Sequence, residues 1–261
     1  MPERECDPVS PLVTPERLVE IFAEYHGVSL TDLRLPETAI LIPVYPLFRK
    51  LMKELKGEAM AAWSWKQPPF YEFEMGPYGK GVAACSPMGA PNVAIALEEL
   101  AAHGVRTVYF FGFAGGIKGK VRPGDLVLPP YAHVGEGTSR YYGDTPLTFA
   151  DRELRENVRR GLEERLKAPV FGCPVWTTDA LYRETSEDIT RAARKGVCGV
   201  DMETSAVFGV AHTLSVRAVA LLWVSDILGP DGWEPHFHKG VLRRAIGRHV
   251  KAFKEFLSSQ G

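Results

Sequence analysis

The stretch GAPNVAIALEELAAHGVRTVYFFGFAGG, residues 89–116, decides the fold class of this chain. After Pro91, apolar residues recur every three or four positions, which is the spacing of one buried helix face. Gly104 ends this helix, and residues 105–112 form a continuous apolar run of strand length. The next segment, residues 113–125, is rich in glycine and predicts a loop. A helix beside a wholly apolar strand is typical of a sheet that is covered on both faces.

The same alternation of strands and helices extends in both directions along the chain. Apolar runs predict strands at 38–44, 81–85, 126–129, 197–200 and 216–224. Capping residues and apolar stripes predict helices at 14–27, 46–57, 91–104, 150–167, 186–195, 203–212 and 241–257. We therefore predict a single α/β domain over residues 1–261 with a mostly parallel sheet, which begins with a loose, polar arm at residues 1–13.

Composition excludes several classes of partner. The chain has 261 residues, of which 45% are hydrophobic and 24% charged, so it can bury a large core without cross-links. Its net charge is −1, from 31 basic and 32 acidic side chains, and a nucleic-acid partner would require a basic surplus. No segment has the length of a membrane span, and the polar N-terminus lacks a signal-peptide pattern. We expect a cytoplasmic protein with no nucleic-acid or membrane partner.

The cysteines and histidines do not predict a metal site. Four cysteines, widely separated in sequence, lack the paired spacing of zinc ligands, and we predict that they are reduced thiols: Cys6, Cys85, Cys173 and Cys198. His236 and His238 form a His-x-His pair without a third ligand at a telling distance. The segment that contains them, PDGWEPHFHKG at 230–240, predicts instead a mobile loop in which Trp233 or Phe237 stacks on a ligand.

Three segments at the carboxyl ends of predicted strands are candidates for a ligand site, because open α/β sheets bind ligands there. The first is the Gly-rich segment that starts at Gly112, where backbone N–H groups can approach an anion; a tight turn explains it equally well. The second is VDMET at 200–204. Its two carboxylates suit the hydroxyl groups of a sugar, whereas for either residue alone capping of the following helix by Asp201 is the simpler explanation.

The third candidate segment is WVSD at 223–226. An acid at the end of a buried strand can protonate a leaving nitrogen when partial burial raises its pKa. As an isolated residue, Asp226 is explained more simply by a capping or loop role.

In this order and spacing, the three segments resemble the nucleoside phosphorylase superfamily, which includes uridine phosphorylase, hexameric purine nucleoside phosphorylase and methylthioadenosine nucleosidase. The resemblance spans residues 40–226 and includes GDLV at 124–127 and TTDALYRET at 177–185. It implies a three-layer α/β/α sandwich with a central mixed, mostly parallel sheet, and a homo-oligomer that is a dimer or a hexamer. It also implies attack at ribose C1′ through an oxocarbenium-like transition state.

The resemblance assigns roles to individual residues. Met202 and Glu203 would hold the ribose, with Glu203 on its hydroxyl groups. Asp226 would be the catalytic acid at the purine N7, and Ser225 and Tyr182 would lie with it beside the base. The phosphate or nucleophile side would be formed by a further set: Gly112, Phe113, Ala114, Gly115 and Arg49.

The sequence departs from the family where phosphate should bind. Phe110 stands where phosphorolytic relatives usually carry an arginine, and Phe113 replaces a hydroxyl residue. Phe48 replaces a second arginine. A phosphate dianion in a closed cleft requires charged or well-oriented donors. The remaining candidate cations are Arg49, Lys66 and Arg140.

The sequence therefore predicts a nucleoside phosphorylase that needs no cofactor and uses inorganic phosphate as co-substrate. Its expected substrate is a purine ribonucleoside, with uridine as the second choice of base. One alternative is a nucleosidase that uses water, for which Glu136 or Glu184 would be the base. Another is a non-catalytic nucleoside-binding protein on the same scaffold.

Overall fold

The computed structural model of this chain describes residues 11–61, 68–237 and 239–259. Most of the predicted arm at 1–13, the candidate cation Lys66 and the histidine His238 therefore lie outside the described residues. The strands are β1 (Thr38–Ile42), β2 (Glu58–Ala59), β3 (Tyr71–Glu74), β4 (Lys80–Cys85), β5 (Thr107–Ile117), β6 (Leu126–Val127), β7 (Tyr131–Gly135), β8 (Leu147–Phe149), β9 (Val175–Thr178), β10 (Gly199–Asp201), β11 (Arg217–Gly229) and β12 (Gly232–Pro235). The α-helices are α1 (Pro15–His26), α2 (Tyr45–Leu55), α3 (Ala90–Ala102), α4 (Arg152–Leu166), α5 (Ser186–Arg194), α6 (Thr204–Thr213) and α7 (Gly240–Leu257).

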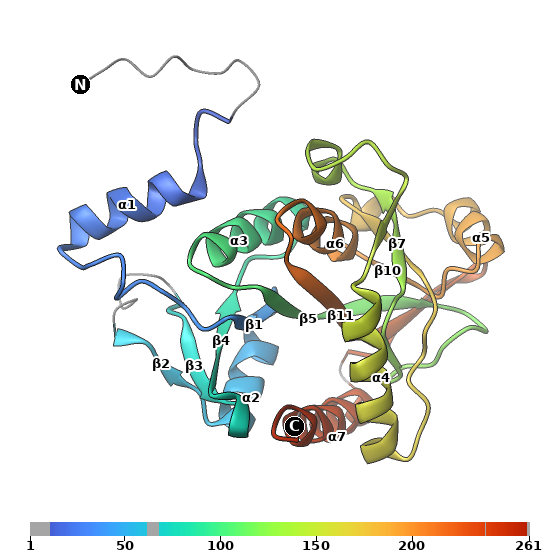
Figure 1. The fold of residues 1–261 in the computed structure, drawn as a ribbon. Coiled ribbons are helices and arrows are strands. Elements are labelled where there is room, and N and C mark those ends of the chain that lie inside the picture. Colours follow the sequence, from blue (N-terminus) through green and yellow to red (C-terminus); the bar gives the residue numbers. More distant parts are fainter. Residues whose placement is uncertain (1–10, 62–67, 238, 260–261) are drawn as a thin grey trace.

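All described strands join one mixed sheet. Its main path runs β2-β3-β4-β1-β5-β10-β9-β7-β8, and β11 pairs with β5, β6 and β12. The central pairs β4–β1, β1–β5 and β5–β11 are parallel, whereas β10 runs antiparallel to β5. The predicted three-layer α/β sandwich is confirmed, because helices cover both faces of this sheet (Figure 1).

The apolar strands divide their side chains between two cores, one on each face of the sheet. In β11, Ala218, Ala220 and Leu222 pack on one face, and Val219, Leu221 and Trp223 pack on the other. This alternation follows from the two-residue period of a strand. Helices α3 and α6 cover the first face, and helices α2, α4 and α7 cover the second (Figure 1).

Parts of two predicted loops are strands in the structure. The Gly-rich segment continues β5 to Ile117, because its ladder with β11 extends to Leu228 and β10 pairs with its end. Glycine is required there for packing: a Cβ on Gly116 would lie 2.7 Å from side-chain carbons of Val121 and Val224. The segment after Asp226 was predicted as a loop, yet Gly232–Pro235 forms β12, which folds back antiparallel on β11.

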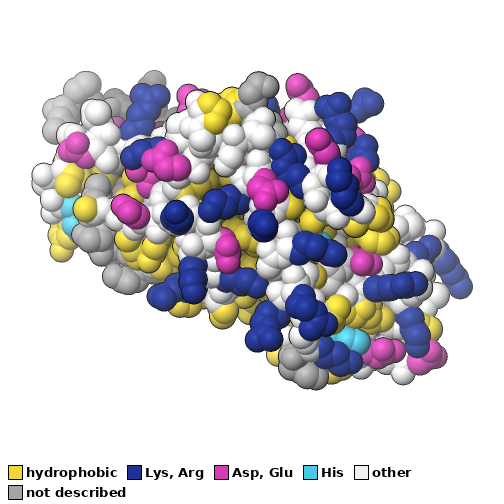
Figure 2. Space-filling model, turned by 90° about the horizontal axis from the view of Figure 1, so that it is seen from below, with side chains coloured by type: hydrophobic (Ala, Val, Ile, Leu, Met, Phe, Trp, Pro, Cys, Tyr) yellow, Lys and Arg dark blue, Asp and Glu magenta, His cyan; other side chains and the backbone are white. Residues whose placement is uncertain are grey.

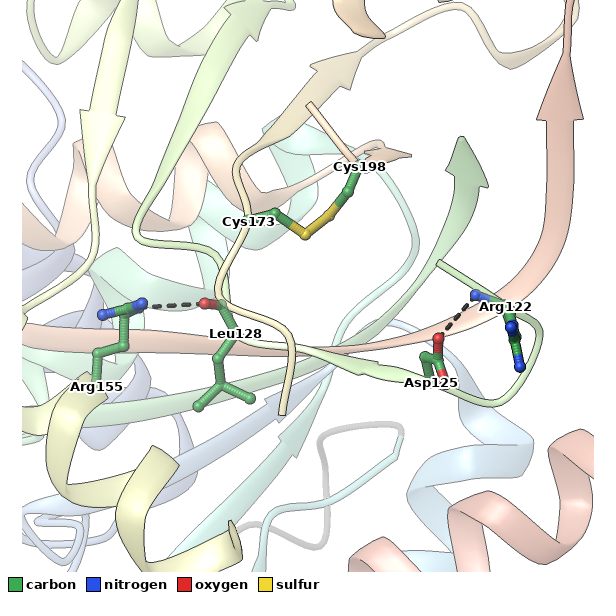
Figure 3. Close-up of a disulfide and its surroundings, with 6 residues drawn as sticks. All are labelled: Arg122, Asp125, Leu128, Arg155, Cys173 and Cys198. Atoms are coloured by element: carbon green, nitrogen blue, oxygen red, sulfur yellow. Dashed lines mark hydrogen bonds between the residues drawn. A yellow bond between two sulfur atoms is a disulfide. The ribbon is translucent and has the colours of Figure 1, made fainter. Parts of the chain in front are cut away.

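The prediction of reduced thiols is wrong for two cysteines. Cys173 and Cys198 form a disulfide (Figure 3), and their Cα atoms lie 5.9 Å apart. The two residues precede the neighbouring parallel strands β9 and β10, so the pairing of these strands brings them together. Cys85 is a free, half-buried thiol, and Cys6 lies outside the described residues. Within the described residues, no helix is both long and apolar enough to cross a membrane.

Candidate active site

A cavity of about 570 Å³ opens beside the central strands, within the size range of small-molecule sites. It brings together segments that are far apart in sequence: the middle of β5, the end of β10, the end of β11, the hairpin strand β12 and the connection after β9. Its lining comprises Pro43, Val44, Met88, Phe113, Ala114, Gly115, Leu181, Tyr182, Glu184, Val200, Asp201, Met202, Glu203, Ser225, Asp226, Leu228, Trp233 and Phe237. All three segments expected from the sequence contribute to this lining.

The two acids of the VDMET segment have different surroundings. Asp201 is buried at the start of α6, where its Oδ2 accepts hydrogen bonds from the backbone N–H groups of Glu203 (3.3 Å) and Thr204 (2.8 Å). Its Oδ1 accepts from the Thr177 hydroxyl at 2.7 Å. Asp201 therefore satisfies the amide of Thr204, the first residue of α6, although the N-cap position itself is Glu203.

The Glu203 side chain lines the cavity, and its carboxylate is held by a backbone N–H group. Its Oε1 accepts a hydrogen bond of 2.7 Å from the backbone N–H of Gly89, at the start of α3. Burial, followed by the negative charge of Asp201, raises the pKa of Glu203 to about 7, although the backbone N–H groups of Gly89 and Met202 act in the opposite direction. A carboxylate offers about four acceptor positions, so this one retains capacity for hydroxyl hydrogens of a ligand.

Asp226 owes its orientation to an irregularity in β11. The register with β5 shifts between Val224 and Asp226, so Ser225 forms a bulge, and bulges redirect the side chains that follow them. Asp226 Oδ1 accepts from the Ser225 hydroxyl at 2.6 Å, and Oδ2 accepts from the Trp233 indole N–H at 2.7 Å. A Cβ on Gly115 would lie 3.1 Å from Oδ2, so glycine leaves room for this carboxylate.

The base-side segment carries a further acid. Glu184 follows the short 3-10 helix Leu181–Arg183 and lines the cavity with Tyr182. Burial, then the negative charges of Asp226 and Asp188, raises the pKa of Glu184 to about 7. Glu136, the other acid considered for water activation, lies outside the lining. Its carboxylate accepts hydrogen bonds from the backbone N–H groups of Thr138 and Ser139 and from the Ser205 hydroxyl.

Two residues expected on the phosphate side do not reach the cavity. Gly112 is buried within β5, and its surroundings are filled: an added Cβ would meet the side chains of Phe110 and Leu222. Arg49 is exposed on α2 and Arg140 is exposed near Tyr141, and neither contributes to the lining. Among the described residues that line the cavity, four are carboxylic acids and none is Lys, Arg or His.

Trp233 and Phe237, which the sequence suggested as residues that stack on a ligand, both line the cavity, and Trp233 lies in strand β12 instead of the predicted loop. Their rings lie 5.9 Å apart at the cavity, and both side chains are more than half exposed. No local sequence signal pointed to the Trp233–Asp226 hydrogen bond, because it depends on the pairing of β12 with β11.

Comparisons with known proteins agree with this geometry. Residues 46–258 match the profile of the Phosphorylase superfamily, and the chain belongs to this family of nucleoside phosphorylases and nucleosidases. A DeoD-type purine nucleoside phosphorylase of Clostridium beijerinckii is 30% identical over 216 residues, covering 81% of this chain and 86% of the relative. Some other curated relatives are matched over about three fifths of their length.

Two solved structures share the fold at low sequence identity. Purine nucleoside phosphorylase from Toxoplasma gondii, in complex with immucillin-H, has a TM-score of 0.73 at 16% identity, covering 87% of this chain and 92% of that one. A putative methylthioadenosine nucleosidase from Weissella paramesenteroides has a TM-score of 0.68 at 18% identity, covering 86% and 100%.

Proposed function

We propose that this protein cleaves the N-glycosidic bond of a purine ribonucleoside, with inorganic phosphate as acceptor, to give ribose 1-phosphate and the free base. The observation that carries this proposal is that Glu203 and Asp226 line one cavity of nucleoside size. Membership of the phosphorylase superfamily and the purine-specific name of the Clostridium relative support it.

In this proposal the two acids act on opposite ends of the substrate. Glu203 accepts hydrogens from the ribose hydroxyl groups and fixes the sugar, while Met202 forms an apolar wall. Asp226 binds the purine N7 and delivers a proton to it as the C1′–N9 bond breaks and its electron pair passes to the base. An oxygen of the nucleophile then bonds to C1′. The rings of Trp233 and Phe237 exclude water from the base.

Hydrolysis is the second candidate, and a specific observation favours it. A phosphate dianion needs charged or well-oriented donors, and the described lining offers four carboxylic acids and no cationic side chain. Water needs no such cation. In that case Glu184, which lines the cavity, is the candidate base. For phosphorolysis, the cation would come from a second copy of the chain in a homo-oligomer, which light scattering can detect.

The test measures base release from inosine, adenosine, guanosine and uridine, with and without phosphate. Phosphorolysis predicts release that depends on phosphate and yields ribose 1-phosphate. Release that is equal without phosphate would reject phosphorolysis in favour of the nucleosidase. Nucleoside binding without any base release would reject both and leave a binding protein.

A matched pair of variants tests the acid. Asp226→Asn should lower purine turnover about 100-fold, because a general acid typically contributes that much. Asp231→Asn makes the same chemical change in the turn between β11 and β12, at a side chain that is 79% exposed and paired with Lys118. It should leave turnover unchanged. If Asp226→Asn turns over purine nucleosides at the wild-type rate, Asp226 is not the general acid.

A further inference from the structure

A second cavity, of about 510 Å³, shares no lining residue with the first. It lies between the connection from β5 to β6, the segment before β9 and the C-terminal helix α7. Its lining comprises Gly119, Lys120, Val121, Arg122, Gly124, Asp125, Leu126, Ala168, Pro169, Phe171, Arg248 and His249. The cationic side chains that are missing from the first lining are therefore present here.

The charges of this second cavity are only partly balanced by its own lining, in which Asp125 interacts electrostatically with Arg122. Within the described part of the chain, Lys120, Arg122 and Arg248 take part in no ion pair. Asp125 is the one carboxylic acid of the lining, and its Oδ2 accepts a 2.8 Å hydrogen bond from the backbone N–H of Arg122 (Figure 3). Three cations and one acid leave this lining with a positive charge, in a protein whose net charge is −1.

His249 adds a donor with a defined orientation. The Trp223 indole N–H, which can only donate, lies 2.9 Å from His249 Nδ1, so Nδ1 must accept and the hydrogen of the neutral ring is on Nε2. The ring is neutral because burial, then the charge of Arg248, lowers the pKa of His249 to about 4. Nη2 of Arg248 lies 3.5 Å from Nε2. Both atoms of this contact are therefore N–H donors, and within the described residues neither finds its acceptor in the other, although His249 is only 5% exposed.

The surroundings of this cavity also favour an anion. Helices α2 and α7, on the lower side of Figure 1, carry eight Lys or Arg side chains and two acidic ones. The face seen from below carries many separate Lys and Arg side chains (Figure 2). Such a field raises the local concentration of anions and speeds their association. Beside the cations, Phe171 and Pro169 provide an apolar surface for the organic part of a ligand.

We propose that this second cavity binds a phosphate-bearing small molecule. Its phosphoryl oxygens accept hydrogen bonds from Arg122, Arg248 and His249 Nε2–H, and its organic part packs on Phe171. The cavity volume suits a ligand of nucleotide or sugar-phosphate size. This site is separate from the site of glycosidic cleavage, so the proposal does not depend on the reaction.

The experiment is isothermal titration of the full chain at low salt with three probes: inorganic phosphate, ribose 5-phosphate and AMP. Each is titrated in the presence of saturating nucleobase, to occupy the first cavity. The double variant Arg122→Glu and Arg248→Glu should weaken binding about 100-fold, since each lost charge-assisted contact is worth roughly tenfold. Both side chains are exposed, so the variant should melt like wild type.

Arg243→Glu is the control for each single charge reversal, because it reverses one exposed charge on α7 outside the cavity. It should change the affinity by less than about threefold, as expected for a screened charge. The double variant and Arg243→Glu should both cleave nucleosides at the wild-type rate. The inference is overturned if no probe binds wild type at millimolar concentration, or if the double variant binds as tightly as Arg243→Glu. It is also overturned if binding is lost in Glu203→Gln but retained in the double variant, because the ligand then occupies the first cavity.

Discussion

Replacing Glu203 by Gln should stabilise the protein at alkaline pH while impairing its reaction. The side chain is 5% exposed, and burial together with Asp201 raises its pKa from 4.5 to about 7. Between these two pH values the folded state binds a proton that the unfolded chain releases. The sign follows from this difference: the contribution of Glu203 to stability is most favourable below pH 4.5 and is lost as pH rises through 7.

The size of the effect follows from the same two pKa values. Their separation corresponds to about 3 kcal/mol of unfolding free energy, most of it lost between about pH 5 and pH 8. The substituted glutamine would carry no charge, yet its amide oxygen can still accept the hydrogen bond from Gly89. The stability advantage of Glu203→Gln over wild type should therefore be larger at pH 8 than at pH 5, by up to about 3 kcal/mol.

Urea unfolding at both pH values measures this difference directly. Glu255→Gln, an exposed carboxylate on α7, is the control, and its difference from wild type should be nearly the same at the two pH values. The reasoning is refuted if Glu203→Gln shows the same difference from wild type at pH 5 and pH 8. Turnover is measured on the same samples, because a gain in stability with a loss of activity is expected when a buried charge serves a ligand.

Three further predictions test the packing around the site. Reducing the Cys173–Cys198 disulfide should lower the unfolding free energy by about 3 kcal/mol, because the two cysteines are 25 residues apart in sequence; an unchanged urea midpoint in reductant would contradict this. Trp233→Phe keeps an aromatic ring but removes the indole N–H that donates a hydrogen bond to Asp226. This variant should lower kcat/KM for a purine nucleoside about tenfold. Wild-type kinetics would show that the hydrogen bond is dispensable. Gly116→Ala should cost about 1–3 kcal/mol in thermal or urea unfolding, since the new Cβ would lie 2.7 Å from methyl groups of two valines. Gly137→Ala, whose nearest contact would be 3.7 Å, should unfold like wild type.

Local sequence signals predicted most of the helices and the central strands. Thr14 caps α1 as expected, with its hydroxyl accepting from the backbone N–H of Arg17, and Gly27 ends the helix in the left-handed conformation. Short strands such as β3, β7 and β9 were not predicted, because they lack a continuous apolar run. Their conformation depends on the neighbouring strands with which they pair, and this information is not local.

Periodicity and capping act over a few residues, so the amino-acid sequence was enough to predict the alternation of strands and helices. The strand before Asp226 was predicted to end at Val224, but β11 continues through Asp226 to Gly229, because β12 pairs with this extension. Tertiary structure alone decided which groups meet. Gly89 donates to a carboxylate 114 residues further along the chain, the bulge at Ser225 directs Asp226 toward Trp233, and strand pairing joins Cys173 to Cys198. The tertiary structure also places Arg49 on the outer surface, because the apolar face of α2 is buried against the sheet and its charged face is exposed.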